Sequence, residues 1–73
     1  MTNEEIGKKL GLTYSAVSRL RRGERLPSIG VMIAVETHFA WSVADQVKTR
    51  ASHGAKAYAR VLEEHIQEVI NDK

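Results

Sequence analysis

Arginine side chains gather in one short stretch of this chain. Residues 14–25, YSAVSRLRRGER, contain four arginines, and Glu24 is the only acidic residue among them. A guanidinium group is planar, keeps its charge, and can donate two parallel hydrogen bonds to a phosphate or to the edge of a guanine. A helix that contacts only water usually alternates the signs of its charges. The stretch therefore predicts an anionic partner.

A helix over residues 14–22 would separate this stretch into two sides. On a period of 3.6 residues, Val17 and Leu20 lie on an apolar side. The opposite side presents Ser15, Ser18, Arg19 and Arg22. An α-helix fits the major groove of duplex DNA, where each base pair shows a distinct pattern of donors and acceptors. The sequence therefore predicts a helix that reads bases in double-stranded DNA.

A second short helix is predicted just before this one. Thr2 and Glu5 have the spacing of a capping box, in which each side chain satisfies a free backbone donor. Gly7 stands inside the helix, where glycine costs about 1 kcal/mol relative to alanine, so we expect a close backbone approach there. Gly11 predicts a left-handed C-cap, and Thr13 predicts the N-cap of the next helix. The supporting helix would lie across the reading helix and fix its angle in the groove.

This stretch resembles the helix-turn-helix of the phage repressor and Cro-like DNA-binding family. The resemblance rests on a small residue in the first helix, a turn glycine, an apolar residue in the second helix and an arginine-glycine before a proline, here Gly7, Gly11, Val17, Arg22, Gly23 and Pro27. It continues to Val47. The family usually has a further helix before this motif, and we expect the chain to start too late to contain it. The sequence also departs from the family at Glu36 and Gln46, where small or apolar residues are usual.

The resemblance assigns roles to individual side chains. It implies base contacts by Tyr14, Ser15, Ser18 and Arg19. Arg19 can donate two hydrogen bonds to O6 and N7 of a guanine, which discriminates by about 1–3 kcal/mol. Phosphates are the expected targets of Asn3, Thr13, Arg21, Arg22 and Arg25. The alternatives are that Tyr14 packs over the turn as a surface ring and that these arginines are only solvated charges.

Composition and charge agree with a small binding module. A chain of 73 residues makes one domain, and a domain of this size buries only about 60% of the surface of its unfolded chain. The formal net charge is +2, and residues 1–27 hold six basic and three acidic side chains. The absence of cysteine excludes a disulfide framework and a thiolate zinc site, and it suits a reducing cytoplasm. No apolar run has the length of a membrane span, and no signal peptide is visible.

Two core helices are predicted within residues 28–48. Ser28 can cap the first of them, which runs to about Phe39. Ser42 and Asp45 have the spacing of a second capping box at the start of the other.

The end of the chain predicts a long amphipathic helix over residues 55–71, after a bend over residues 49–54. Its apolar stripe consists of Tyr58, Leu62, Ile66, Val69 and Ile70. One explanation is that this helix folds back, replaces the missing first helix of the family and completes the core. The other is that it crosses a second copy and builds a homodimer, whose two reading helices would lie about 34 Å apart on a palindromic site. A combination of the two is a third alternative.

These elements together predict an all-α fold in a single domain, residues 1–73. It is a small helix-turn-helix domain of about five helices, with a reading head at residues 2–27, core helices at residues 28–48 and the C-terminal core or association helix at residues 55–71.

The functional hypothesis is a transcriptional regulator, similar to a phage Cro or immunity repressor, that occupies an operator in double-stranded DNA as a homodimer. No metal is expected, because the histidines lack a second ligand at a useful spacing. No enzymatic activity is expected, because the serines lack an activating histidine. Nor do we expect a cofactor, a membrane or a small-molecule ligand. Two alternatives stay open. The chain could be an antitoxin-like protein-interaction module, or an architectural factor such as a recombination directionality protein that bends DNA.

Overall fold

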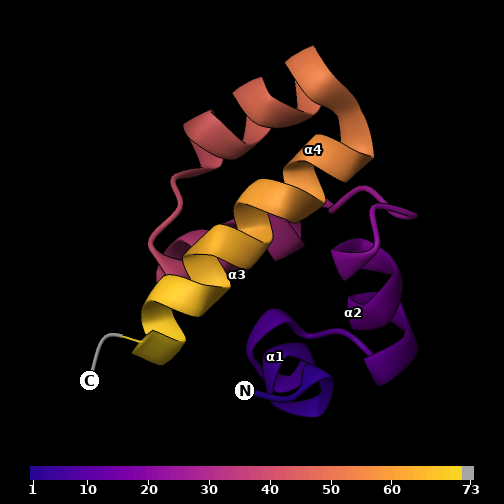
Figure 1. The fold of residues 1–73 in the computed structure, drawn as a ribbon, viewed down its shortest axis with the longest axis vertical. Helices are drawn as coiled ribbons and strands as arrows, with labels where there is room; N and C mark the ends of the chain where they lie inside the picture. Colours follow the sequence, from indigo (N-terminus) through magenta and orange to yellow (C-terminus); the bar gives the residue numbers. More distant parts are fainter. Residues whose placement is uncertain (72–73) are drawn as a thin grey trace.

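The computed structural model describes residues 1–71 and contains four α-helices in that range (Figure 1). They are α1 (Asn3–Leu10), α2 (Tyr14–Arg21), α3 (Ile29–Phe39) and α4 (Val43–Asn71). No strand occurs within residues 1–71, so the predicted all-α fold class is confirmed. The number of helices is four because the two helices predicted after residue 42 join into α4.

Helix α4 changes direction at one residue, Gly54. Its φ of 83° and ψ of −168° are the only non-helical pair inside α4, and this region of backbone space is essentially restricted to glycine. Residues 49–53 are helical, which corrects the bend predicted over residues 49–54. We call residues 43–53 the first segment of α4 and residues 55–71 the second segment; the two form a sharp corner in Figure 1.

The predicted N-cap and C-cap of α1 are confirmed in detail. Thr2 Oγ1 accepts a hydrogen bond from Glu5 N–H, and Glu5 Oε1 accepts one from Thr2 N–H, so the capping box is complete. Gly11 adopts a left-handed φ of 70°. A Cβ on Gly7 would lie 2.5 Å from the carbonyl oxygen of Leu12, so the chain after the turn passes directly over this glycine. The absence of a side chain at Gly7 is what lets α1 and α2 pack so closely.

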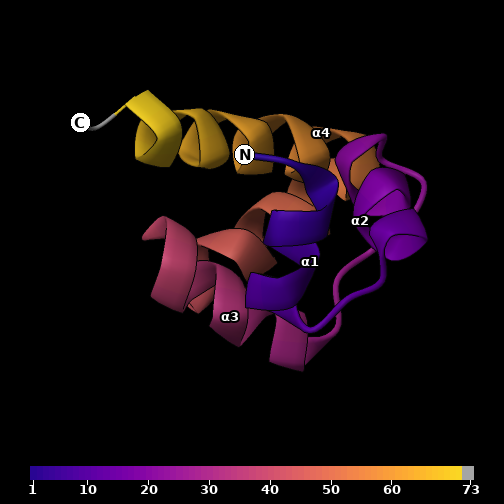
Figure 2. The same ribbon diagram turned by 90° about the horizontal axis from the view of Figure 1, so that it is seen from below.

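The core lies between α3 and the second segment of α4, which occupy opposite sides of the molecule with α2 at one end (Figure 2). Three side chains of the predicted apolar stripe, Tyr58, Leu62 and Ile66, are at most 1% exposed within this single chain. Val69 and Ile70 are partly buried against the same core. The second segment therefore folds back onto its own chain, and three of its five stripe residues have no exposed surface with which to contact a second copy.

One polar side chain, Gln46, is fully buried in this core. Its Nε2 donates to the carbonyl oxygens of Met32 (2.8 Å) and Trp41 (2.7 Å), and its Oε1 accepts from the Tyr58 hydroxyl (2.8 Å). A buried amide costs free energy unless its donors and acceptors are paired, and here they are. Burial also raises the pKa of Tyr58, so its hydroxyl keeps the proton that it donates to Gln46. Gln46, in the first segment of α4, thereby connects this segment both to α3 and to the second segment of α4.

Glu36, the other departure from the family pattern, has a structural role at the start of α4. Its Oε2 accepts a hydrogen bond from Val43 N–H (3.0 Å), the first backbone donor of the helix. Ser42 Oγ accepts from Asp45 N–H (3.2 Å), as the predicted capping box requires of the serine. Glu36 and Ser42 thus satisfy two of the free donors at this end. None of the helices within residues 1–71 is long and apolar enough to cross a membrane.

Candidate nucleic-acid interface

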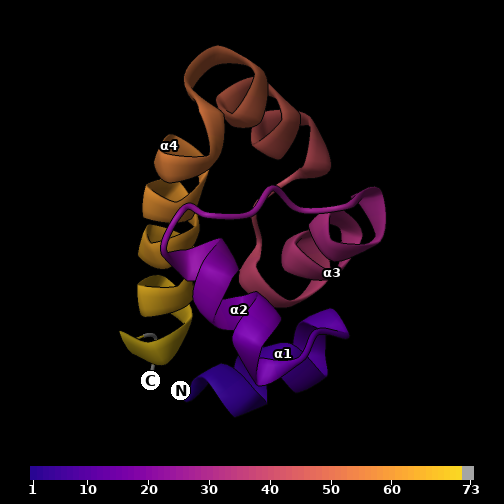
Figure 3. The same cartoon turned by 90° about the vertical axis from the view of Figure 1, so that its right-hand side faces the viewer.

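Helix α2 lies at the edge of the molecule with one side in the core and the other outside (Figure 2). Ala16, Val17 and Leu20 are buried, and Thr13 Oγ1 caps the helix by accepting from Ala16 N–H (3.2 Å). The helix ends at Arg21 with Arg22 as its C-cap, one residue before the predicted end. Figure 3 views the molecule from the side on which α2 lies, so α2 is the helix nearest to the viewer.

The four residues predicted to contact bases gather on the outward side of α2. Tyr14 is 64% exposed, Ser15 and Arg19 are also exposed, and Ser18 is partly buried. The exposure of Tyr14 shows that its ring does not pack into the core. No ion pair engages Arg19 within residues 1–71, so its guanidinium can bind a partner without first losing a carboxylate.

Arg22 has close partners at the same surface. Its Nε and Nη2 donate to the carboxylate of Glu24 (2.9 and 3.3 Å), and its Nη1 donates to Ser18 Oγ (2.6 Å). The hydrogen bonds with Arg22 lower the pKa of the Glu24 carboxyl. All three guanidinium nitrogens thus have a partner, but the ion pair is exposed, with side-chain exposures of 56% for Arg22 and 55% for Glu24. An exposed pair of this kind is weak, so a phosphate can compete for Arg22.

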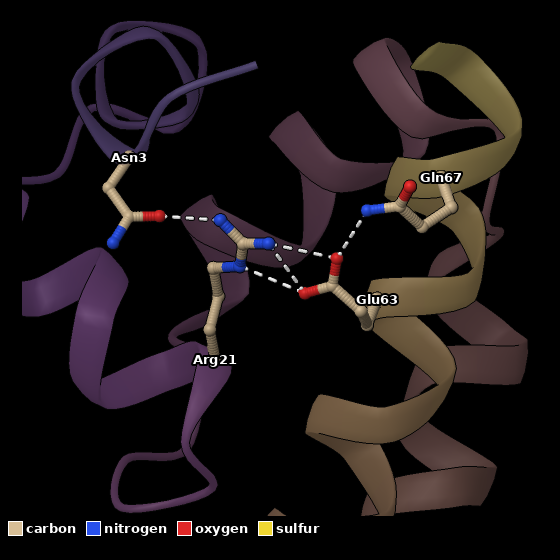
Figure 4. A network of polar contacts seen from close by, with 4 residues as sticks. All are labelled: Asn3, Arg21, Glu63 and Gln67. Carbon is tan, nitrogen blue, oxygen red and sulfur yellow. Dashed lines mark hydrogen bonds and ion pairs between the residues drawn. The ribbon is translucent and has the colours of Figure 1, made fainter. Parts of the chain in front are cut away.

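The guanidinium of Arg21 is bound by other side chains of the protein, which departs from its predicted role as a phosphate contact (Figure 4). Its Nε and Nη2 donate to the two carboxylate oxygens of Glu63 (2.9 and 2.8 Å), and its Nη1 donates to Asn3 Oδ1 (2.5 Å). Gln67 Nε2 donates to the same carboxylate (2.8 Å). All three nitrogens of the guanidinium therefore donate hydrogen bonds to other residues of the chain. The two bonds to Glu63 have the paired geometry that an arginine and a carboxylate favour.

The network of Asn3, Arg21, Glu63 and Gln67 joins α1, α2 and α4. Burial of the Glu63 carboxyl opposes its ionisation, but hydrogen bonds from Gln67 and Arg21, together with the positive charge of Arg21, lower its pKa. The pair is partly shielded from water, with side-chain exposures of 25% for Arg21 and 36% for Glu63. The contact therefore fixes how α2 is oriented relative to the second segment of α4.

The other residues predicted to contact phosphates lie at the N-cap of α2 (Thr13), after its C-terminal end (Arg25) and at the start of α1 (Asn3). Thr13 and Arg25 are exposed, and Arg25 forms no ion pair in the described part of the chain. Asn3 is partly buried, and its carbonyl oxygen is occupied by Arg21. The sequence pattern did not indicate Glu63, because 42 residues separate it from Arg21 and no local spacing connects them.

One comparison with known proteins bears on this site. A family model described as helix-turn-helix matches residues 1–42, which is more than half of the chain and contains α1, α2 and α3. Neither a curated protein nor a solved structure matches.

Proposed function

This chain belongs to the helix-turn-helix family of the Cro type, whose members are DNA-binding regulators, and we propose that it binds an operator sequence in duplex DNA through α2. In this proposal it acts as a phage Cro or immunity repressor does. Tyr14, Ser15, Ser18 and Arg19 contact base edges, while Arg22, Arg25 and Thr13 contact phosphates. Arg21 is left out of the contact set because Glu63 and Asn3 engage its guanidinium.

The observation that supports this function is the outward side of α2. A helix of eight residues buries three small or aliphatic side chains and leaves Tyr14, Ser15 and Arg19 exposed. Hydroxyl and guanidinium groups are the donors and acceptors that read base edges in the major groove. The supporting helix α1 and the Arg21–Glu63 pair hold α2 at a fixed angle, which a base-reading helix requires.

The antitoxin-like alternative has less support from the structure. It relies on a C-terminal helix that becomes ordered only on a partner protein, whereas Tyr58, Leu62 and Ile66 are buried in the core of this chain. We therefore retain operator binding as the proposed function.

Selection of bound sequences from a random pool of duplex DNA tests the proposal. The salt concentration must be fixed, because phosphate contacts make affinity fall steeply with salt. We expect enrichment of a defined motif, with an inverted repeat whose half-sites lie about one helical turn apart if the protein binds as a dimer. A pool that shows no enriched motif after several rounds would contradict sequence-specific binding.

We also propose that a second copy binds through α3 and the loop before it. Leu26, Ile29 and Ile33 are 49%, 62% and 53% exposed, and Ile29 and Ile33 lie one turn apart on α3. Large aliphatic side chains that are exposed as a group are found where proteins associate. Sedimentation equilibrium of the protein, free and bound to its selected DNA, tests this: Ile33→Glu should shift the protein from dimer to monomer. A wild-type protein that stays monomeric even on the DNA would exclude the homodimer.

A further inference from the structure

The second segment of α4 begins beside the end of the reading helix. Gly23, which follows α2, has a left-handed φ of 75°, and a Cβ on it would lie 2.8 Å from both Cα and Cγ of Lys56. The turn after α2 therefore rests directly on the stem of Lys56. Figures 1 and 2 show the beginning of this segment on the side of the molecule where α2 lies, while its C-terminal end runs away from α2.

Charge is distributed unevenly along this segment. Lys56 and Arg60 lie in its first half, and the acidic residues Glu63, Glu64 and Glu68 follow them. Residues four apart share one side of a helix, so Lys56 and Arg60 are neighbours on the surface. Both are exposed, and neither forms an ion pair among residues 1–71. The basic half of the segment is the half that adjoins α2.

Lys56 and Arg60 are continuous with the basic surface of the reading head. A shallow hollow on the surface is lined by Arg22 from the end of α2 and by Lys56 and Arg60 from α4. Acidic residues line the same hollow farther along α4, but Glu63 is paired with Arg21. A duplex carries one phosphate charge per about 1.7 Å of its axis, so a protein that inserts a helix in the major groove also meets the backbone beside it.

We propose that Lys56 and Arg60 bind phosphates of the DNA strand that passes the C-terminal end of α2. This inference rests on the proposed operator binding and adds α4 to the DNA-contacting elements. The contacts carry no sequence information; they position the protein on the duplex. Each phosphate neutralised releases counterions, so each contact contributes about 0.9 to the slope of log affinity against log salt concentration.

The test uses Lys56→Gln and Arg60→Gln, singly and together, with Lys48→Gln as the matched control. Lys48 is also exposed and lies on the first segment of α4, and its substitution removes the same charge from the same helix. Dissociation constants are measured on the selected operator and on random duplex DNA between 50 and 200 mM salt, after circular dichroism has shown that each variant is folded.

We expect Lys56→Gln and Arg60→Gln to weaken binding to both DNAs by the same factor. The affinity of each single variant should change about 3.5-fold less than that of the wild type over this salt range, as the loss of one phosphate contact requires. Lys48→Gln should keep the wild-type slope. If Lys56→Gln and Arg60→Gln behave like Lys48→Gln while the wild type still prefers the operator, this inference is overturned and operator binding stands. If the wild type binds neither DNA, both proposals fail.

Discussion

Arg19 lies on the outward side of α2 and Arg22 is its C-cap, three residues later, but the surroundings of the two arginines differ. Arg19 forms no ion pair within residues 1–71, whereas Arg22 donates hydrogen bonds to Ser18 and Glu24. We expect Arg19→Ala to reduce the preference for the operator over random DNA by about 1–3 kcal/mol, because the guanidinium no longer donates two bonds to a guanine. The ratio of the two dissociation constants at one salt concentration measures this effect. An unchanged ratio would remove Arg19 from the base-reading set.

Arg22→Gln should have a different effect from the Arg19 substitution. Loss of a phosphate contact should weaken binding to operator and random DNA equally and reduce the salt slope by about one. Fluorescence anisotropy titrations at several salt concentrations measure both quantities. A change in sequence preference without a change in slope would instead place Arg22 against a base edge, oriented there by Glu24.

At the residue scale, the sequence predicted which side of α2 points outward but not which arginines are free. Val17 and Leu20 define the buried side through their spacing, and burial is confirmed for both. The fate of Arg21 depends on Glu63, which only the folded chain brings near it. A pattern within one helix contains no information about such a partner.

At the scale of elements, Gly54 and Gly30 provide a matched pair of substitutions. A Cβ would meet no atom within 4 Å at Gly54, but the φ of 83° is one that alanine rarely adopts, so Gly54→Ala should destabilise the protein by about 1–3 kcal/mol. Gly30 lies in the first turn of α3, and a Cβ on it would meet only Ser28 Oγ, at an ordinary contact distance of 3.9 Å. Gly30→Ala should therefore be neutral or stabilise by up to about 1 kcal/mol.

Urea unfolding followed by circular dichroism compares the two glycine variants. The expected result is a lower midpoint for Gly54→Ala and an equal or higher midpoint for Gly30→Ala. Equal midpoints for both variants would show that the corner of α4 straightens without cost. In that case the second segment would not be anchored to α2 and α3 as firmly as its buried side chains indicate.

The predicted helix boundaries were right where a capping residue marks the start of a helix, and wrong at residues 49–54, where the prediction rested on composition alone. Thr2, Thr13 and Ser28 each accept a backbone hydrogen bond at the predicted helix start. Residues 49–53 have a polar, bend-like composition yet remain helical, since nothing before Gly54 interrupts the backbone. The corner forms at Gly54, the one residue there that can adopt this backbone conformation, and the segment after it docks Tyr58, Leu62 and Ile66 in the core.

For the whole molecule, the sequence left one question open that the structure answers. An apolar stripe shows that a helix is buried, but it cannot show whether the covering surface comes from the same chain or from a second copy. The second segment of α4 closes the core of its own chain, and Gln46 and Glu36 supply polar contacts where the family has apolar ones. The fold class and the buried side of α2 were thus predictable from local patterns, and the closure of the core was not.

Three carboxyl groups make the stability of the whole domain depend on pH. The folded protein lowers the pKa of Glu5 through Thr2, of Glu24 through Arg22, and of Glu63 through Gln67 and Arg21 against the opposing effect of burial. At a pH between its two pKa values, such a carboxyl is ionised in the folded protein but protonated in the unfolded chain. Its contribution to stability is therefore complete above the usual value of 4.5 and is lost as the pH falls below it.

Thermal unfolding between pH 7 and pH 3 measures this dependence. We expect a nearly constant Tm down to about pH 5 and a progressive fall below it, as linkage requires of lowered carboxyl pKa values. Glu63→Gln should lower the Tm at pH 7, because Arg21 loses its carboxylate, and should flatten the fall in acid, because one titrating group is gone. If Glu63→Gln kept both the Tm at pH 7 and the full acid dependence, the Arg21–Glu63 pair would not hold α2 on α4, and the orientation of the reading helix would have to come from apolar packing alone.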